Sequence, residues 1–253
     1  MEDIIPLFKS HYSLGRSILT LNLPKEAANS GSDSVFDITQ EAGMKEVYLV
    51  EDSMAGFLEA YTNSKEVGVK LIFGLRLTFC PDHSDKSEEG RSNSFKSIIF
   101  IKNEKGYKQL IKIYTRAAQD GFYYEPRTDF RTLKGMWSDD LLLAIPFYDS
   151  FLYNNKYTNS QCIPNFSFTD PIFFLEDNDT LLDQDMDNSV REFCKDKYKT
   201  IKAKSIYYKN KDDFSAYLTH KCINKRTSLE KPNFDGMCSN DFCYESYKEV
   251  ING

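Results

Sequence analysis

Leu-Phe-Lys-Ser-His-Tyr-Ser-Leu, residues 7–14, is the segment that most constrains the fold, because it has the form of a first β-strand leading into a metal site. Such a strand would end in two histidines spaced H-x-H. This one supplies His11, but Lys9 stands at the other position. A lysine ammonium has no lone pair and repels a metal ion instead of binding it. The segment therefore predicts an enzyme-like scaffold whose chemistry has been altered.

Composition indicates a globular chain with a substantial core. Of the 253 residues, 41% are hydrophobic and 28% are charged, and the 19 Phe and 16 Tyr predict an aromatic-rich core. The formal charge of -6 argues against tight binding to duplex DNA, which requires a dense basic face to neutralise phosphates. Binding to a partner protein, or to an anionic ligand through a small local basic patch, stays open.

The cysteines and the N-terminal residues predict a cytoplasmic protein. Six cysteines are scattered without a C-x-x-C pair, and the acidic start of the chain does not resemble an export signal. We therefore expect free thiols. No apolar run approaches the length needed to span a bilayer, which is about 20 residues.

Short apolar strands alternate with helical segments, which favours a parallel α/β architecture. We expect one barrel domain over residues 1–226 and a helical C-terminal appendage over 227–253, with a mobile polar loop at 81–94. The expected strands cover residues 4–9, 46–50, 69–79, 97–102, 141–145, 172–175 and 200–207, and the expected helices cover 34–42, 56–67, 104–119, 181–194 and 211–224.

Six segments in series resemble the polymerase and histidinol phosphatase (PHP) domain of the bacterial DNA polymerase III alpha subunit. The most specific is Lys-Asn-Glu-Lys-Gly-Tyr-Lys-Gln-Leu at 102–110, which is similar to that family's K-N-x-x-G-Y-x-x-L. The others lie at 8–14 (H-x-H, then Y-S-L), 50–61 (T-D-H and its helix), 68–76 (G-I-K-P-I-I-G-x-E), 121–127 (G-F-Y-Y-x-P-R) and 203–223 (A-T-N-D-x-H-Y, then L-x-C-I). The resemblance implies a distorted seven-stranded, TIM-like β/α barrel.

The resemblance also implies a metal cluster, but most of its ligands are changed here. Active members bind several metal ions through His, Asp, Glu and Cys, and use metal-bound hydroxide to hydrolyse phosphoesters. Carried over residue by residue, His11 and Asp52 match ligands. The altered ligand positions are Lys9, Ser53, Arg76, Ser205 and Tyr207. We expect no cofactor, and we expect Lys9 and Arg76 to pair with Asp52 or Glu51.

Ordinary structural roles are also open for the remaining candidates. His11 can be a hydrogen-bonded residue at a strand end, and Asp52 can cap the helix that follows it. His83 would be solvated in its polar loop, and His220 would pack on a helix face. Lys202, Lys204, Lys209 and Lys211 form a small basic run that is typical of a solvated surface.

The sequence leaves three hypotheses about function. The first is a catalytically inactive binding or structural module in DNA replication, whose partner is a polymerase core or a proofreading exonuclease. Because the resemblance does not extend to the polymerase palm, we expect such a module to work in a bacterial cytoplasm beside a separately encoded core, as in a virus with a fragmented replication apparatus. The second is a phosphoesterase or 3′–5′ exonuclease using Mn or Zn on His11, Asp52 and Glu176. The third is anion binding, with Lys9 and Arg76 as phosphate clamps.

Overall fold

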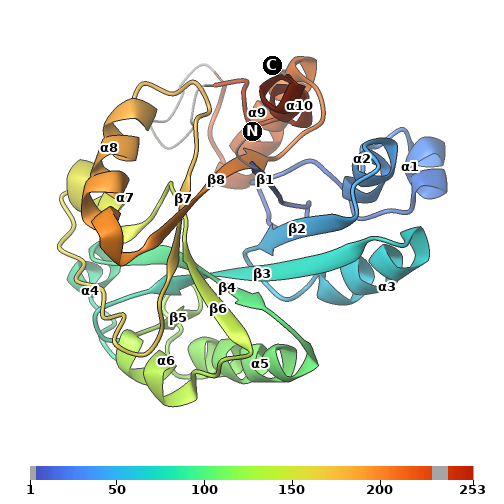
Figure 1. The fold of residues 1–253 in the computed structure, drawn as a ribbon. Coiled ribbons are helices and arrows are strands. Elements are labelled where there is room, and N and C mark those ends of the chain that lie inside the picture. Colours follow the sequence, from blue (N-terminus) through green and yellow to red (C-terminus); the bar gives the residue numbers. More distant parts are fainter. Residues whose placement is uncertain (1–3, 230–238, 253) are drawn as a thin grey trace. The chain divides into compact units, whose positions relative to one another are not determined.

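The computed structural model describes residues 4–229 and 239–252. Strands and helices alternate along the chain, which confirms the predicted α/β class (Figure 1). Contacts divide the chain into two compact units. One unit combines residues 1–73, 176–183 and 202–253, and the other combines 74–175 and 184–201. Each unit therefore brings together segments that are distant in the sequence.

Three parallel strands organise the first unit. β1 (Ile5–Phe8) lies between β2 (Glu46–Glu51) and β8 (Lys199–Ile206) and is parallel to both. Because parallel strands point the same way, the residues that follow their carboxyl ends gather at one edge. Lys9 and Asp52, which directly follow β1 and β2, are brought together in this way.

The helices of the first unit begin and end largely where the sequence indicates. Ser34 accepts a hydrogen bond from the backbone N–H of Phe36 and caps α2, as predicted. Gly68 ends α3 with a φ of +74°. α1 was not predicted, although Pro24 at its first position is a known start signal. The elements are α1 (Pro24–Ser30), α2 (Val35–Glu41), α3 (Phe57–Val67), η2 (Lys211–Asp213), α9 (Phe214–Lys225) and α10 (Tyr244–Asn252).

The second unit contains an antiparallel strand, so the parallel architecture that the alternation favours does not hold for every strand. β4 (Phe95–Ile101) runs antiparallel to both β3 (Lys70–Phe79) and β6 (Leu141–Ile145), whereas β6 and β7 (Ile172–Leu175) are parallel. The two-residue β5 (Arg127–Thr128) pairs in parallel with the end of β3.

Helices of the second unit connect these strands. α5 has the bounds that the sequence predicts, and Asn103 caps it by accepting from the N–H of Gly106. A Cβ on Gly106 would lie 2.3 Å from the carbonyl oxygen of Asp140, which explains the glycine in this motif. Figure 1 shows α5 beside α6, and α6 and α7 were not predicted. The elements are α4 (Glu88–Ser92), α5 (Glu104–Gln119), α6 (Phe130–Met136), α7 (Phe151–Tyr157), α8 (Asp183–Cys194) and η1 (Lys195–Lys197).

The core of the second unit is rich in aromatic side chains, as its composition predicts. Phenylalanine rings from β3, β4, α6, α7 and β7 contact one another at centroid distances between 5.2 and 6.4 Å. Edge-to-face and offset contacts of this kind add to the free energy gained by burying the rings. The rings include Phe79, Phe95, Phe130, Phe151, Phe166 and Phe173.

The C-terminal residues that the structure describes pack on the first unit. Tyr207 donates its backbone N–H to the carbonyl of Phe242, and Tyr244 donates to the carbonyl of Tyr208, both at 3.0 Å. The predicted boundary at residue 226 stays a prediction, and part of the expected appendage, 230–238, lies outside the described residues. Five cysteines are free thiols, and Cys238 is not among the described residues. Within those residues, no helix has the length and apolar character that crossing a membrane requires.

Candidate functional site

A buried lysine lies at the end of β1. Lys9 is 5% exposed, and its ammonium donates hydrogen bonds to the carbonyl oxygen of Val50 and to Oδ1 of Asp52, each at 3.0 Å. The parallel register of β1 and β2 places these groups side by side. The ion pair expected for Lys9 is therefore present, with Asp52 as its partner.

A second carboxylate, Glu51, is fully buried beside this pair. It accepts hydrogen bonds from the backbone N–H of Ser10 at 2.9 Å and from the hydroxyl of Ser13. Burial raises the pKa of Glu51, while Lys9 and the two serines act in the opposite direction. The positive charge of Lys9 therefore stabilises two carboxylates, Asp52 and Glu51, and Glu51 has no access to water.

Four charged side chains form a corresponding network in the second unit. Arg76 is 7% exposed and forms an ion pair with Asp149, which follows β6. Lys96 lies 2.6 Å from Glu125 and also donates to the hydroxyl of Thr78. Burial alone would raise the pKa of Glu125, but Lys96 and its other partners lower it overall. The structure thus gives Arg76 a carboxylate partner that differs from the two expected, Asp52 and Glu51.

Glu176 is buried at the end of β7 and accepts three hydrogen bonds. The donors are the backbone N–H of Ser205 at 2.9 Å, the Ser205 hydroxyl at 3.1 Å and the Asn178 amide at 3.0 Å. Burial raises the pKa of Glu176, and these donors oppose that shift. Beside it, Lys204 pairs with Asp241. Glu176 therefore links β8 to the segment after β7. This structural role explains why a carboxylate is buried at this position.

The remaining predicted site residues have separate local environments. The Nδ1 atom of His11 is buried without a hydrogen-bond partner in the structure. The Ser53 hydroxyl accepts from the N–H of Ala55 at 3.3 Å. Tyr207, one of the altered ligand positions, stacks on Phe242 with ring centroids 5.4 Å apart. These contacts are those of packed or turn residues.

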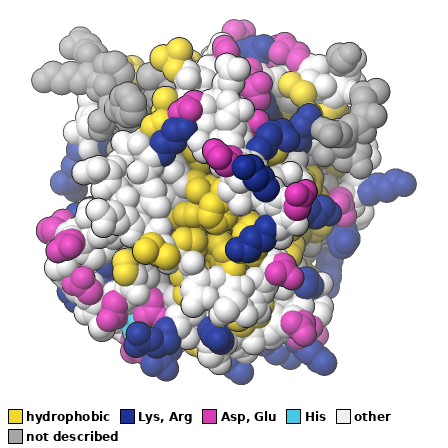
Figure 2. Space-filling view, turned by 60° about the vertical axis from the view of Figure 1, so that its left-hand side comes forward, with side chains coloured by type: hydrophobic (Ala, Val, Ile, Leu, Met, Phe, Trp, Pro, Cys, Tyr) yellow, Lys and Arg dark blue, Asp and Glu magenta, His cyan; other side chains and the backbone are white. Residues whose placement is uncertain are grey.

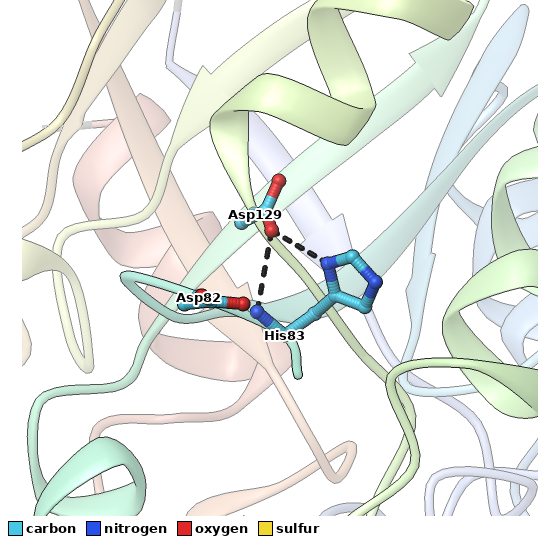
Figure 3. Close-up of side chains that lie close together, drawn as sticks. All are labelled: Asp82, His83 and Asp129. Carbon is cyan, nitrogen blue, oxygen red and sulfur yellow. Dashed lines mark hydrogen bonds and ion pairs between the residues drawn. The ribbon is translucent and has the colours of Figure 1, made fainter. Parts of the chain in front are cut away.

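The described residues hold one group of three ligand-type side chains whose candidate ligand atoms all lie within 4.8 Å of one another. It consists of Asp82, His83 and Asp129, so it includes none of the predicted metal-site remnants (Figure 3). Asp82 and His83 follow β3, and Asp129 precedes α6. The structure does not bring His11, Asp52 and Glu176 into such a group.

His83 is held by Asp129, so the expectation that it is solvated is wrong. Its Nδ1 lies 2.6 Å from Oδ2 of Asp129, and its side chain is 22% exposed. Asp129 also accepts from the N–H of Thr132 and thereby caps α6. Burial would raise the pKa of Asp129, but the hydrogen bonds from Thr132 and His83 lower it overall. Because 46 residues separate His83 and Asp129, no local pattern signals their contact.

Comparisons with known proteins agree with the sequence resemblance. The chain is 34% identical over 96 residues to the DNA polymerase III subunit alpha of Helicobacter pylori, an alignment that covers 38% of this chain and 8% of that protein. It is 26% identical over 228 residues to the corresponding subunit of Aquifex aeolicus, covering 83% of this chain and 20% of that protein. The chain therefore spans a fifth or less of the length of these relatives.

A solved structure from Bifidobacterium adolescentis, provisionally described as a metal-dependent phosphoesterase, aligns over 100% of this chain and 97% of its own. The sequence identity is 14% and the TM-score is 0.27, and a likeness this weak supports no conclusion about fold or function. The family model of the PHP domain matches residues 24–151, slightly more than half of the chain. This match also bears out the predicted α/β fold of the PHP type. The chain belongs to the PHP domain family and is related to the PHP region of bacterial DNA polymerase III alpha subunits.

Proposed function

We propose that this chain is a PHP-domain protein that acts as a binding or structural module in DNA replication and does not hydrolyse phosphoesters. The observation that carries the proposal is the Lys9 ammonium, which lies 3.0 Å from the Asp52 carboxylate. A position that the resemblance assigns to a metal ligand thus carries a cation, and a protein carboxylate balances its charge.

The side chains at these positions do not fit a cluster of several metal ions. Such a cluster needs many lone-pair donors close together. Lys9 and Arg76 have no lone pair to offer, and both form ion pairs with carboxylates. Glu176 already accepts three hydrogen bonds. No hydrolytic step is therefore assigned to this chain.

A replication partner is supported by the kinship with DNA polymerase III alpha subunits. We expect the partner to be a polymerase core or a proofreading exonuclease. Direct duplex binding is disfavoured by the charge of -6. Figure 2 agrees with this, because basic and acidic side chains are interspersed on the described part of the face that it shows.

The catalytic part of the proposal is tested by assaying hydrolysis with Mn²⁺ and with Zn²⁺. The substrates are 4-nitrophenyl phosphate and an end-labelled single-stranded oligonucleotide, and the control is Asp52→Ala. We expect the same background rate for both proteins. Hydrolysis that the Asp52→Ala change abolishes would refute the proposal and support the reduced site of His11, Asp52 and Glu176.

The binding part is tested with purified partners on a sizing column. The chain is mixed with a bacterial polymerase alpha subunit from which the PHP region has been deleted, and separately with a proofreading exonuclease. We expect co-elution with at least one of them. Independent elution from both would refute this form of the proposal.

The ion pairs also bear on the hypothesis of phosphate clamps. An anion would have to displace a carboxylate from Lys9 or Arg76, and this competition weakens binding. We therefore expect millimolar phosphate, sulfate and nucleotides to leave the melting temperature unchanged. A concentration-dependent rise that is lost in Arg76→Gln would favour anion binding instead.

A further inference from the structure

We propose that Asp82, His83 and Asp129 bind a single Zn²⁺ ion, which ties the segment after β3 to the start of α6. All three residues belong to the second unit, and none of them is an altered ligand position, so the site does not depend on the proposed function.

The spacing of the candidate ligand atoms suits a tetrahedral ion. With metal–ligand bonds of about 2.0–2.2 Å, ligand atoms around Zn²⁺ lie roughly 3.3 Å apart. The ligand atoms here lie within 4.8 Å of one another, and Nδ1 of His83 lies 2.6 Å from Oδ2 of Asp129. To bind one ion, the distance between His83 and Asp129 must therefore increase. The other distances between ligand atoms must decrease by about 1.5 Å at most. Asp82 and His83 lie in a loop, where shifts of this size need no rearrangement of a strand or helix.

Hydrogen bonds to neighbouring groups fix both carboxylates in place. Oδ1 of Asp82 accepts from the N–H and hydroxyl of Ser84, and none of the described residues donates to its Oδ2. Oδ1 of Asp129 accepts from the backbone N–H of Thr132, and its Oδ2 accepts from the backbone N–H of His83 at 3.2 Å and lies 2.6 Å from Nδ1 of the same residue. In Figure 3 the Asp129 carboxylate and the imidazole ring face each other. Each carboxylate thus has one oxygen that positions it and a second that can reach an ion, as in known metal centres.

The types of ligand select the class of metal. One imidazole nitrogen with two carboxylates suits Zn²⁺, whereas Mg²⁺ prefers six oxygen ligands in an octahedron. Three protein ligands leave a fourth position for water. Asp82 is exposed and the His83 side chain is 22% exposed, so an ion can enter from solvent. The ion would add a cross-link between two segments that hydrogen bonds and a Phe79–Phe130 ring contact already join.

The test is titration of the full chain with ZnCl₂ in a calorimeter, with MgCl₂ as the comparison metal. We expect one equivalent of Zn²⁺ to bind and to raise the melting temperature, and Mg²⁺ to do neither. Asp82→Asn and His83→Gln should each weaken Zn²⁺ binding at least tenfold. The matched control is His220→Gln, which changes a histidine of the first unit and should leave the affinity unchanged.

Because Asp82 is exposed, we expect Asp82→Asn to fold, and a melting temperature equal to that of the unmodified chain without metal shows that loss of binding does not come from unfolding. Absence of binding to the unmodified chain at 100-fold molar excess of Zn²⁺ would overturn the inference. So would an equivalent that survives Asp82→Asn and His83→Gln but is lost in Asp52→Ala, because the ion would then lie in the first unit.

Discussion

Replacing Lys9 by methionine is expected to destabilise the protein strongly. Methionine fills the space of the apolar lysine stem with a side chain of similar length and lacks the ammonium. Asp52 then loses its partner at 3.0 Å, and the carbonyl of Val50 loses a donor. Glu51, which is fully buried, loses the nearby positive charge that opposes the rise in its pKa.

The magnitude follows from the burial of the two partners. Breaking a buried ion pair by removing one member costs about 3–5 kcal/mol. The side chain of Lys9 is 6% exposed, but that of Asp52 is 27% exposed, so water screens part of the remaining charge. We therefore expect the free energy of unfolding to fall by about 3 kcal/mol. For a chain of this size, that corresponds to a drop in melting temperature of roughly 6–12 °C.

The assay is urea denaturation of the variant beside Lys70→Met as a matched control. Lys70 pairs with Glu46 at 3.6 Å, but the two side chains are 72% and 43% exposed. This control should lose less than about 0.5 kcal/mol. Adding Asp52→Asn to Lys9→Met should recover part of the loss, because it removes the negative charge that Lys9 balanced.

The pH dependence gives a further check on the same change. A carboxyl whose folded pKa is raised contributes stability at low pH, and this contribution is lost as pH rises through the folded pKa. Burial raises the pKa of Glu51, and Lys9→Met removes the cation that opposes it. The deficit of Lys9→Met should therefore shrink as pH falls and Glu51 takes up a proton. Equal stability of Lys9→Met and Lys70→Met at pH 7 would show that the reasoning is wrong.

Four further substitutions test the second unit. Arg76→Glu places two carboxylates in contact at Asp149 and should cost about 3 kcal/mol in thermal unfolding; no change would contradict the pairing. Asp129→Ala removes the cap of α6 and should cost about 1–2 kcal/mol at pH 7. Because the folded pKa of Asp129 is lowered, this cost should disappear as pH falls through that pKa. Gly121→Ala puts a Cβ 1.9 Å from a backbone oxygen and should prevent soluble expression. Gly135→Ala in α6, with no atom within 4 Å, should stabilise the protein by about 0.5–1 kcal/mol.

Patterns local in the sequence predicted most of the secondary structure. The bounds of α5 and β6 follow from their periodicity, and Ser34 and Gly68 mark helix ends through their backbone preferences. The short helices α4, α6 and α7 were missed, because five to seven residues carry too little periodicity to recognise. The antiparallel direction of β4 was missed as well, since strand direction depends on what the connecting segment packs against.

The sequence by itself determined the α/β class, the kinship with PHP domains and the presence of cations where ligands are expected, because each depends on residue type and order along the chain. Only the tertiary structure decided which groups balance those cations. Lys9 has Asp52, 43 residues away, and Arg76 has Asp149, 73 residues away. The contact of His83 with Asp129, 46 residues away, could likewise not be predicted from the sequence. Such pairs join side chains on different strands or on the segments that follow them, and strand register, which is set by packing of the sheet, fixes which side chains meet.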